Sequence, residues 1–421
     1  MPQARYRARY DGQINRPRYY PGKATWEEHP LTSSERSLQR AYSISDLRAL
    51  ARKRLPRSVF DFIDGGAGDE HTLNGNTAAF DQWMMMPRVC VNVGERRLGR
   101  SILGKEAALP LMLSPTGLAG FFWRGGETAA ARAAARCGIP FCLSTNSIAS
   151  LEEVASAVPD SERWFQLYFL RDREWMDQLI KRAADANYRV LCLTVDLPLT
   201  GRRERDLRNG FSLPLRPTAR ALLDVARHPR WALDALRSKI GFGNFKSIPS
   251  EGFTTVAQHV ASLFDPSADW NTVARIRSIW KGPLAIKGIL HPSDAVTAVE
   301  LGCDAVIVSN HGGRQLDGSP PALTALHAVL AAVGDRTGVI LDGGIRRGSD
   351  ILKAISLGAS ATASGRAFLW GLAAGGEDGV VRATEILREE MDNGLALIGA
   401  PDLGSLTRDH VRHRSEMEVS W

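Results

Sequence analysis

Residues 305–366 read AVIVSNHGGRQLDGSPPALTALHAVLAAVGDRTGVILDGGIRRGSDILKAISLGASATASGR. The stretch contains short apolar runs, each followed by a loop of small or polar residues, with alanine-rich amphipathic segments between them. The runs predict strands at 305–308, 339–341 and 361–363. The segments between them predict helices at 322–332 and 349–357. Alternation of this kind is typical of parallel β-α-β units.

The same alternation extends upstream to residue 109. Five further strands are predicted at 109–113, 141–143, 164–167, 190–195 and 284–286, with helices at 127–137, 173–186 and 292–301. Eight units of this kind favour the α/β class and a closed (β/α)8 TIM barrel over an open, doubly wound sheet. Functional groups are then expected at the carboxyl ends of the strands.

The regions outside this repeat set the predicted domain boundaries. Residues 1–41 are rich in Arg, Pro and Tyr without sustained periodicity, and we interpret them as an extension. A helical pattern starts near Tyr42, with Ser45 as the predicted N-cap, and opens a domain that runs from 42 to 413. Residues 414–421 form a tail.

An insertion at about 205–268 lengthens the connection after the fourth strand, where about ninety residues separate Val195 from Leu284. Two interpretations stay open: a lid or surface that lies on anionic lipid, and a solvated helix packed on the barrel. The basic residues concerned are Arg205, Arg208, Arg216, Arg220, Arg227, Arg230, Arg237, Lys239 and Lys246, and the apolar ones are Phe211, Leu222, Leu223, Trp231, Leu233 and Leu236.

Composition predicts a soluble, globular protein. Of 421 residues, 44% are hydrophobic, and no apolar run approaches the roughly 20 residues that cross a bilayer. The cysteines form no CxxC pair, so we expect reduced core residues, no metal site and a cytoplasmic protein, with contact to the inner face of the membrane as an option. The net charge of +7 is spread along the chain without a nucleic-acid-binding motif, which disfavours nucleic acid as a partner.

Polar residues follow every predicted strand, so they should gather at one rim of the barrel. Loops after the last two strands carry glycines together with Arg346 and Arg366, and such loops in barrels bind phosphate. His311 offers a base beside the permanent cation Arg314, and Asp196 is a carboxylate that could orient it. Lys287 ends an apolar strand and should face an anion, either in a structural salt bridge or on a reduced flavin.

These residues lie in motifs that resemble the FMN-dependent 2-hydroxy acid oxidase and dehydrogenase family, which includes glycolate oxidase, L-lactate dehydrogenase and mandelate dehydrogenase. The resemblance runs from about residue 42 to residue 413. In chain order the motifs are LSPTG (113–117), FQLY (165–168), LTVDLPLTGRRERD (193–206), SNHGGRQLD (309–317) and LDGGIRRG (341–348).

The resemblance implies oxidation of an L-2-hydroxy acid to a 2-oxo acid. It makes His311 the general base and Asp196 its partner, with Arg203 and Arg314 on the substrate carboxylate and Tyr168 on the substrate oxygen. FMN would be held by Pro115, Thr116, Gly117, Ser144, Gln166, Thr194, Lys287, Ser309, Asp342, Gly344, Arg346, Gly365 and Arg366.

The resemblance also implies a homotetramer, and an electron acceptor that is oxygen, a quinone or a carrier protein. Gly117 and the sequence HPRW (228–231) are similar to the membrane-associated dehydrogenases and favour a quinone or a carrier.

One substrate-binding position departs from the family pattern: Phe62 stands where the family has a tyrosine that donates to the substrate carboxylate. Losing that hydrogen bond costs roughly 1.5 to 3 kcal/mol. We therefore expect retained chemistry with a shifted preference, toward a larger or more apolar acid. The alternatives are an FMN-dependent isomerase or another non-oxidative enzyme on the same barrel, and a degenerate barrel kept for binding a partner.

Overall fold

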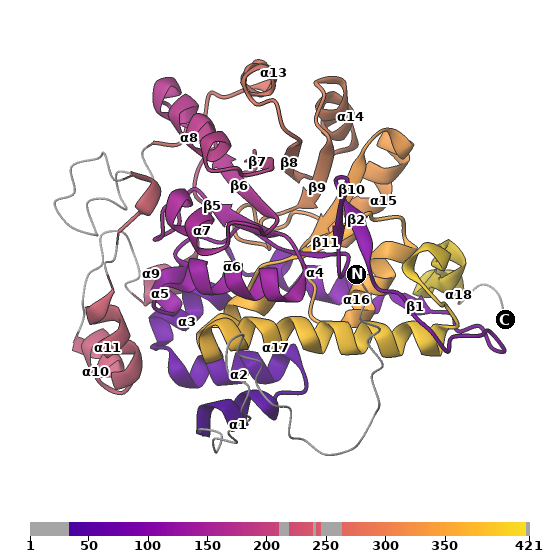
Figure 1. The fold of residues 1–421 in the computed structure, drawn as a ribbon, viewed down its shortest axis with the longest axis horizontal. Coiled ribbons are helices and arrows are strands. Elements are labelled where there is room, and N and C mark those ends of the chain that lie inside the picture. Colours follow the sequence, from indigo (N-terminus) through magenta and orange to yellow (C-terminus); the bar gives the residue numbers. More distant parts are fainter. Residues whose placement is uncertain (1–32, 210–218, 239–240, 246–262, 418–421) are drawn as a thin grey trace, which may run out of the picture.

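A closed barrel of eight parallel strands forms the centre of the molecule (Figure 1). The computed structural model describes residues 33–209, 219–238, 241–245 and 263–417. Around the barrel the strand order is β10-β11-β4-β5-β6-β7-β8-β9. The strands are β4 (Leu111–Leu113), β5 (Phe141–Ser144), β6 (Arg163–Tyr168), β7 (Val190–Thr194), β8 (Leu284–Ile289), β9 (Ala305–Ser309), β10 (Gly338–Asp342) and β11 (Ala361–Ser364). The predicted barrel is therefore confirmed.

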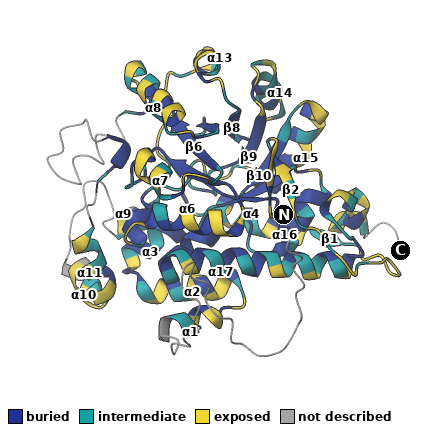
Figure 2. Cartoon of the chain, viewed as in Figure 1, coloured by how far each residue is buried: buried dark blue, intermediate teal, exposed yellow. Residues whose placement is uncertain are grey.

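Helices cover the outside of the barrel, and nearly every residue of the strands is therefore buried (Figure 2). Strands buried on both faces are apolar throughout and do not alternate, as the sequence showed. The helices that follow the strands are α5 (Ala119–Phe122), α6 (Gly126–Cys137), α7 (Leu151–Ala157), α8 (Arg173–Asp185), α13 (Trp270–Ile279), α14 (Pro292–Glu300), α15 (Ala322–Val333), α16 (Gly348–Ser356) and α17 (Arg366–Ile398).

The chain enters the barrel through helices α1 (Ser33–Gln39), α2 (Ile44–Arg54), α3 (Arg57–Asp64) and α4 (His71–Asp81). Helix α1 lies within the expected extension, and its Leu38 is buried against Gly375 of α17. The prediction that Ser45 caps α2 is wrong, because Ser43 is the N-cap. The capping box needs a side chain three residues on that can accept a hydrogen bond. Ser43 has Asp46 there, whereas Ser45 has Arg48.

Two antiparallel pairs were not predicted. Strand β1 (Trp83–Met85) pairs with β12 (Val411–His413), which joins the two ends of the domain. Strands β2 (Arg100–Ile102) and β3 (Lys105–Ala107) form a hairpin whose Ile102 and Ala107 share a buried cluster with residues of the barrel strands, among them Met112 and Trp164. Each strand is only three residues long, too short for periodicity to identify. The chain also forms α18 (Arg414–Met417) and 3-10 turns η2 (Gly334–Arg336), η3 (Leu403–Ser405) and η4 (Arg408–His410).

The insertion after β7 contains α9 (Glu204–Arg208), α10 (Ala219–Ala226), α11 (Pro229–Arg237) and the 3-10 turn η1 (Gly243–Phe245). Helices α10 and α11 pack against each other at the edge of the molecule (Figure 1). Trp231 anchors them: its indole is buried, packs edge-on against Phe121 at 5.3 Å and donates to the Phe121 carbonyl at 3.0 Å. Phe211, Arg216, Lys239, Lys246 and the side chain of Arg220 lie outside the described residues.

No helix in the described ranges combines the length and the apolar character that a membrane span requires.

Candidate active site

A cavity of about 630 Å³ opens at the carboxyl ends of the barrel strands, within the usual range for ligand sites of roughly 300–1,000 Å³. Its wall includes most of the predicted site: Phe62, Pro115, Thr116, Gly117, Tyr168, Arg203, Lys287, His311, Arg314, Asp342, Gly344, Arg346, Gly365 and Arg366. The other predicted residues stand outside the lining and are Ser144, Gln166, Thr194, Asp196 and Ser309. All but Asp196 are buried: Ser144, Thr194 and Ser309 are the last residues of β5, β7 and β9, and Gln166 lies two residues before the end of β6.

His311 and Asp196 form a hydrogen-bonded pair at the cavity, with 2.9 Å between His311 Nδ1 and Asp196 Oδ1. His311 has a φ of 58°, and its backbone N–H donates to Ser309 Oγ at 3.1 Å, so the chain turns sharply after β9. Asp196 fits beside β8 because Gly288 has a φ of 106° and no side chain; a Cβ there would stand 2.6 Å from Asp196 Cβ. The pair therefore depends on a strained histidine and a glycine.

The electrostatics of this pair favour a charged carboxylate. Burial alone would raise the pKa of Asp196, but the charge and hydrogen bond of His311, together with Lys287, bring that pKa below its usual value. A proton on Nδ1, directed at Asp196, leaves Nε2 with the lone pair of a base. Tyr168 Oη lies 3.5 Å from Nε2.

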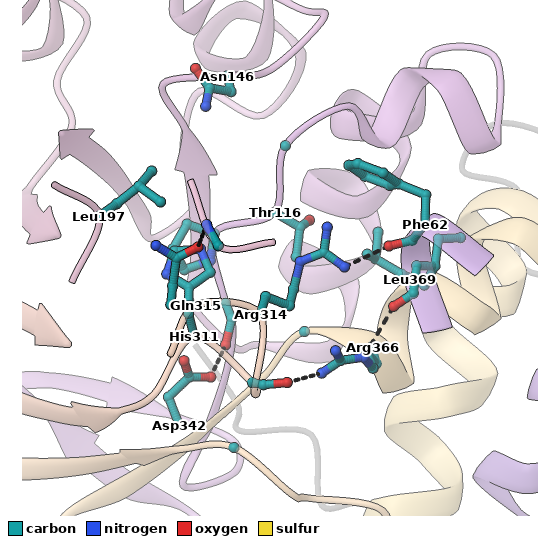
Figure 3. A pocket seen from close by; sticks show the side chains of 18 of the residues that line it. Phe62, Thr116, Asn146, Leu197, His311, Arg314, Gln315, Asp342, Arg366 and Leu369 are labelled. Atoms are coloured by element: carbon teal, nitrogen blue, oxygen red, sulfur yellow. Dashed lines mark hydrogen bonds between the residues drawn. The ribbon is translucent and has the colours of Figure 1, made fainter. Parts of the chain in front are cut away.

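Arg203 and Arg314 converge on the ring of Phe62 (Figure 3 shows Arg314 and Phe62). The guanidinium carbons stand 5.6 Å and 4.7 Å from the ring centroid, respectively. Arg314 also donates to the Phe62 carbonyl at 2.6 Å. Burial, and then the charges of Arg203 and Arg366, lower the pKa of Arg314 well below its usual value. An anion in the cavity would relieve this unfavourable concentration of positive charge.

Lys287 is 3% exposed and pairs with Asp342, with 2.9 Å between Nζ and Oδ2. Asp342 also accepts from Ser114 Oγ at 2.6 Å and Ser309 Oγ at 2.8 Å. The salt-bridge interpretation of Lys287 thus holds, and because Lys287 also lines the cavity, its charge is available to a ligand as well.

Arg346 and Arg366 mark the other end of the cavity. Arg366 donates to the carbonyls of Ile63, Gly312 and Gly65 at 3.0, 2.8 and 2.7 Å. Burial, and then Arg366, lower the pKa of Arg346 to about 9, while burial lowers the pKa of Arg366 to about 10. Two half-buried guanidiniums at one end of the cavity are suited to a phosphate.

The residues present fit FMN. In the described part of the chain, the buried Gln166 Nε2 and Thr194 Oγ1 have no hydrogen-bond partner. Unpaired buried polar atoms are costly. Thr194 ends β7 and Gln166 lies two residues before the end of the neighbouring strand β6, where the polar edge of a flavin would satisfy them. The phosphate would lie against Arg346 and Arg366.

Several lining residues escaped the sequence interpretation: Leu118, Leu197, Asp206, Leu207, Phe242, Phe264 and Gln315. Asp206 closes the quoted motif LTVDLPLTGRRERD, so its place in that motif was a usable signal. Phe242 and Phe264 lie in the insertion, where no local pattern indicates which side chains turn toward the barrel. Among the described residues, no group of His, Cys, Asp and Glu is arranged to hold a metal ion.

Comparison with known proteins agrees with this geometry. A family model described as FMN-dependent dehydrogenase matches residues 51–413. The chain is 44% identical over 372 residues to L-lactate dehydrogenase of Pectobacterium atrosepticum, covering 87% of this chain and 96% of that protein. It is 41% identical over 376 residues to (S)-mandelate dehydrogenase of Pseudomonas putida, covering 89% and 95%. A crystal structure of monotopic membrane protein (S)-mandelate dehydrogenase superposes with a TM-score of 0.86 at 41% identity, covering 89% and 100%.

The family match spans most of the chain, and the solved structure shares its fold throughout the barrel. The isomerase alternative is not favoured by these relatives. This chain belongs to the FMN-dependent dehydrogenase family, and the expected activity, FMN-dependent oxidation of a 2-hydroxy acid, is confirmed at the level of that family.

Proposed function

We propose that the protein oxidises (S)-2-hydroxy acids with a large apolar side chain, and that it passes the electrons to a membrane quinone or a carrier. The observation that carries the proposal is the His311–Asp196 pair at 2.9 Å, beside a cavity that also holds Arg203 and Arg314. Oxidation of a hydroxy acid needs a base for the hydroxyl proton and cations for the carboxylate. This arrangement supplies both.

His311 Nε2 takes the hydroxyl proton, and Asp196 stabilises the imidazolium that results. Arg314 and Arg203 bind the substrate carboxylate and fix the reacting carbon beside the base. Tyr168 Oη, 3.5 Å from Nε2, holds the substrate oxygen. FMN, when bound, supplies the acceptor for the two electrons. The residues that would hold its ring are Pro115, Thr116, Gly117, Ser144, Gln166, Thr194, Lys287 and Ser309, and those that would hold its ribose and phosphate are Asp342, Gly344, Arg346, Gly365 and Arg366.

The apolar part of the cavity supports a large side chain on the substrate. Leu118, Leu197, Leu207, Phe242 and Phe264 line it. Phe264 packs edge-on against the Tyr168 ring at 5.1 Å, so the apolar wall continues up to the catalytic group. Each buried CH₂ of a substrate would contribute about 0.8 kcal/mol. One relative, (S)-mandelate dehydrogenase, is named for an acid with a large apolar side chain.

The substrate class is tested by mixing the yellow holoenzyme anaerobically with L-lactate, glycolate, (S)-mandelate and longer-chain acids, following the flavin band at roughly 450 nm. We expect bleaching, with kcat/KM for (S)-mandelate at least about tenfold above that for L-lactate, because the apolar wall is left unfilled by a methyl group. A higher kcat/KM for L-lactate than for (S)-mandelate would contradict the proposed substrate class. If no acid bleaches the flavin, the proposed oxidation itself is contradicted. Fast peroxide formation in step with substrate loss would contradict the choice of acceptor.

Peripheral membrane contact is proposed through the hairpin surface, defined as the exposed leucines and arginines of α10 and α11. Its leucines are Leu222, Leu223, Leu233 and Leu236, which are 61%, 56%, 49% and 84% exposed. Arg230 and Arg237 are exposed on α11, and Arg227 is exposed in the turn between the two helices. Exposed leucines flanked by arginines suit an anionic lipid interface.

The membrane proposal is tested by sedimentation with phosphatidylglycerol vesicles, with phosphatidylcholine vesicles as the comparison. Changing the four hairpin leucines to serine should abolish binding while anaerobic bleaching persists. The control is Leu397→Ser, an equally exposed leucine (68%) on α17. If the fourfold variant still sediments, the hairpin surface is not the contact.

A further inference from the structure

Helix α9 places a carboxyl group in the wall of the substrate cavity. Asp206 is 8% exposed and lines the cavity together with Arg203 and Arg314. Asp206 follows Arg203 by three residues, the spacing that brings two side chains to one face of a helix. The proposed FMN site, the general base and the carboxylate-binding arginines do not include the Asp206 carboxyl group.

The contacts of Asp206 are unusually weak for a buried carboxylate. Its nearest cation is Arg203, with 3.7 Å between Nη1 and Oδ2, which is beyond a hydrogen bond. In the described residues no hydrogen bond reaches the Asp206 side chain, and carboxylates this buried are normally hydrogen-bonded. Among the described residues, the Asp206 carboxyl group is therefore held in the cavity by charge rather than by hydrogen-bond donors.

The charged groups facing Asp206 come from three parts of the fold. Arg314 belongs to the loop after β9, and Asp61 belongs to α3. Arg203 and Arg205 come three residues and one residue before Asp206 in the sequence. Burial raises the pKa of Asp206, and Asp61 adds to this effect, while Arg314, Arg203 and Arg205 oppose it without cancelling it. A second anion beside the same arginines would disfavour the ionised form further.

We propose that Asp206 is the internal counter-ion of Arg203 and Arg314, and that it takes up a proton when the substrate carboxylate binds to these arginines. This rests on the proposed binding of the carboxylate by Arg203 and Arg314. Because binding takes up a proton, affinity is highest at low pH. It falls as pH rises from the pKa of Asp206 in the free enzyme to its higher pKa in the complex, and is constant on either side. Asp206 is thus a positioning residue whose charge competes with the substrate.

The test uses holoenzyme carrying His311→Gln, in which the acid binds without being oxidised. Asp196→Asn is added throughout, so that the carboxylate whose pKa His311 lowers contributes no proton. The dissociation constants of (S)-mandelate and of L-lactate are measured from the change in the flavin spectrum, from pH 5 to 9 at constant ionic strength. We expect both constants to rise with pH, by up to about tenfold per unit where one proton is taken up. Adding Asp206→Asn should remove the slope, and Asp206→Glu should retain it.

A second measurement does not depend on the Asp206 variants folding. In weak buffer with an indicator dye, saturating (S)-mandelate should cause the His311→Gln holoenzyme to take up as much as one proton per site within the sloping range. Absence of uptake, or a slope that persists in Asp206→Asn, would overturn the inference while leaving the proposed function intact. If neither acid perturbs the flavin at any pH, carboxylate binding at this site fails first, and the inference fails with it.

Discussion

Phe62 stands in place of the expected tyrosine, and its ring lies near two cations as well as 6.1 Å from the ring of Phe122. Arg314 is 4.7 Å and Arg203 5.6 Å from the ring centroid. Such contacts contribute about 0.5–2 kcal/mol each, so the phenylalanine still orders the arginines although it donates nothing to a carboxylate. The residue therefore changes how tightly the substrate is held without removing the cations that hold it.

Phe62→Tyr should raise kcat/KM for every acid that turns over, by about tenfold, because the new hydroxyl adds a hydrogen bond to a charged group. The relative gain should be largest for L-lactate, which has fewest apolar contacts. Phe62→Leu is the matched control: it loses the ring, gains no donor and should lower kcat/KM. Unchanged steady-state kinetics on every acid in Phe62→Tyr would contradict this account.

His311 is the proposed base, and Asp196 is the carboxylate that stabilises its protonated form. His311→Gln should lower kcat by about 10²–10⁴-fold while FMN and substrate still bind, since only proton transfer is removed. Asp196→Asn should also lower kcat, because the imidazolium loses the carboxylate 2.9 Å away. Rapid-mixing reduction kinetics separate these effects from binding. Flavin reduction at the parental rate in either variant would exclude the assigned roles.

At the scale of elements, helix α17 connects the phosphate end of the cavity to the outside of the barrel. It begins at Arg366 and runs to Ile398, and its helical geometry is interrupted at Gly375 and Gly376. Gly376 has a φ of 61°, and a Cβ there would stand 2.4 Å from the Trp123 indole. The kink thus depends on two glycines, and it lets one helix contact both α2 and α6.

Gly376→Ala should lower the free energy of unfolding by about 2–3 kcal/mol, the combined effect of an unfavourable φ and the collision with Trp123. Urea unfolding of the holoenzyme measures the change. Gly241→Ala is the control, because a Cβ at Gly241 meets nothing within 4 Å. Equal urea concentrations at the unfolding midpoints of Gly376→Ala and Gly241→Ala would show that the kink tolerates a side chain.

For the molecule as a whole, the cofactor and the fold are coupled through buried positive charge. Arg346 and Arg366 have lowered pKa values because burial disfavours their charge. A phosphate group reverses that effect, so FMN binding adds to the stability of the entire barrel.

Removal of FMN should therefore lower Tm, and millimolar inorganic phosphate should restore part of the loss, whereas riboflavin, which lacks the phosphate, should restore less. Differential scanning fluorimetry of the apoprotein checks this. Arg366→Met should weaken FMN binding by about ten- to a hundredfold. Arg347→Met should not, because the Arg347 side chain is 55% exposed and pairs with Glu390 on the surface. Equal FMN affinity in both variants would remove Arg366 from the phosphate site.

The sequence by itself determined the barrel and the group of side chains at its rim. Eight apolar runs alternating with helices leave few other arrangements, and parallel strands that close on themselves bring all their carboxyl ends to one side. Residues that follow the strands, such as Tyr168, Lys287 and His311, must then line one cavity. The motifs around them indicated the family and with it the cofactor.

Only the tertiary structure decided which distant segments complete that cavity. Asp206 comes from α9, and Phe242 and Phe264 come from the insertion. The partners of Arg366 are backbone carbonyls, which no side-chain pattern reveals. The pairing of β1 with β12 likewise joins residues more than three hundred positions apart. Periodicity and caps are local properties of the chain, whereas these contacts depend on how whole elements pack, and packing is set by the shape of the completed core.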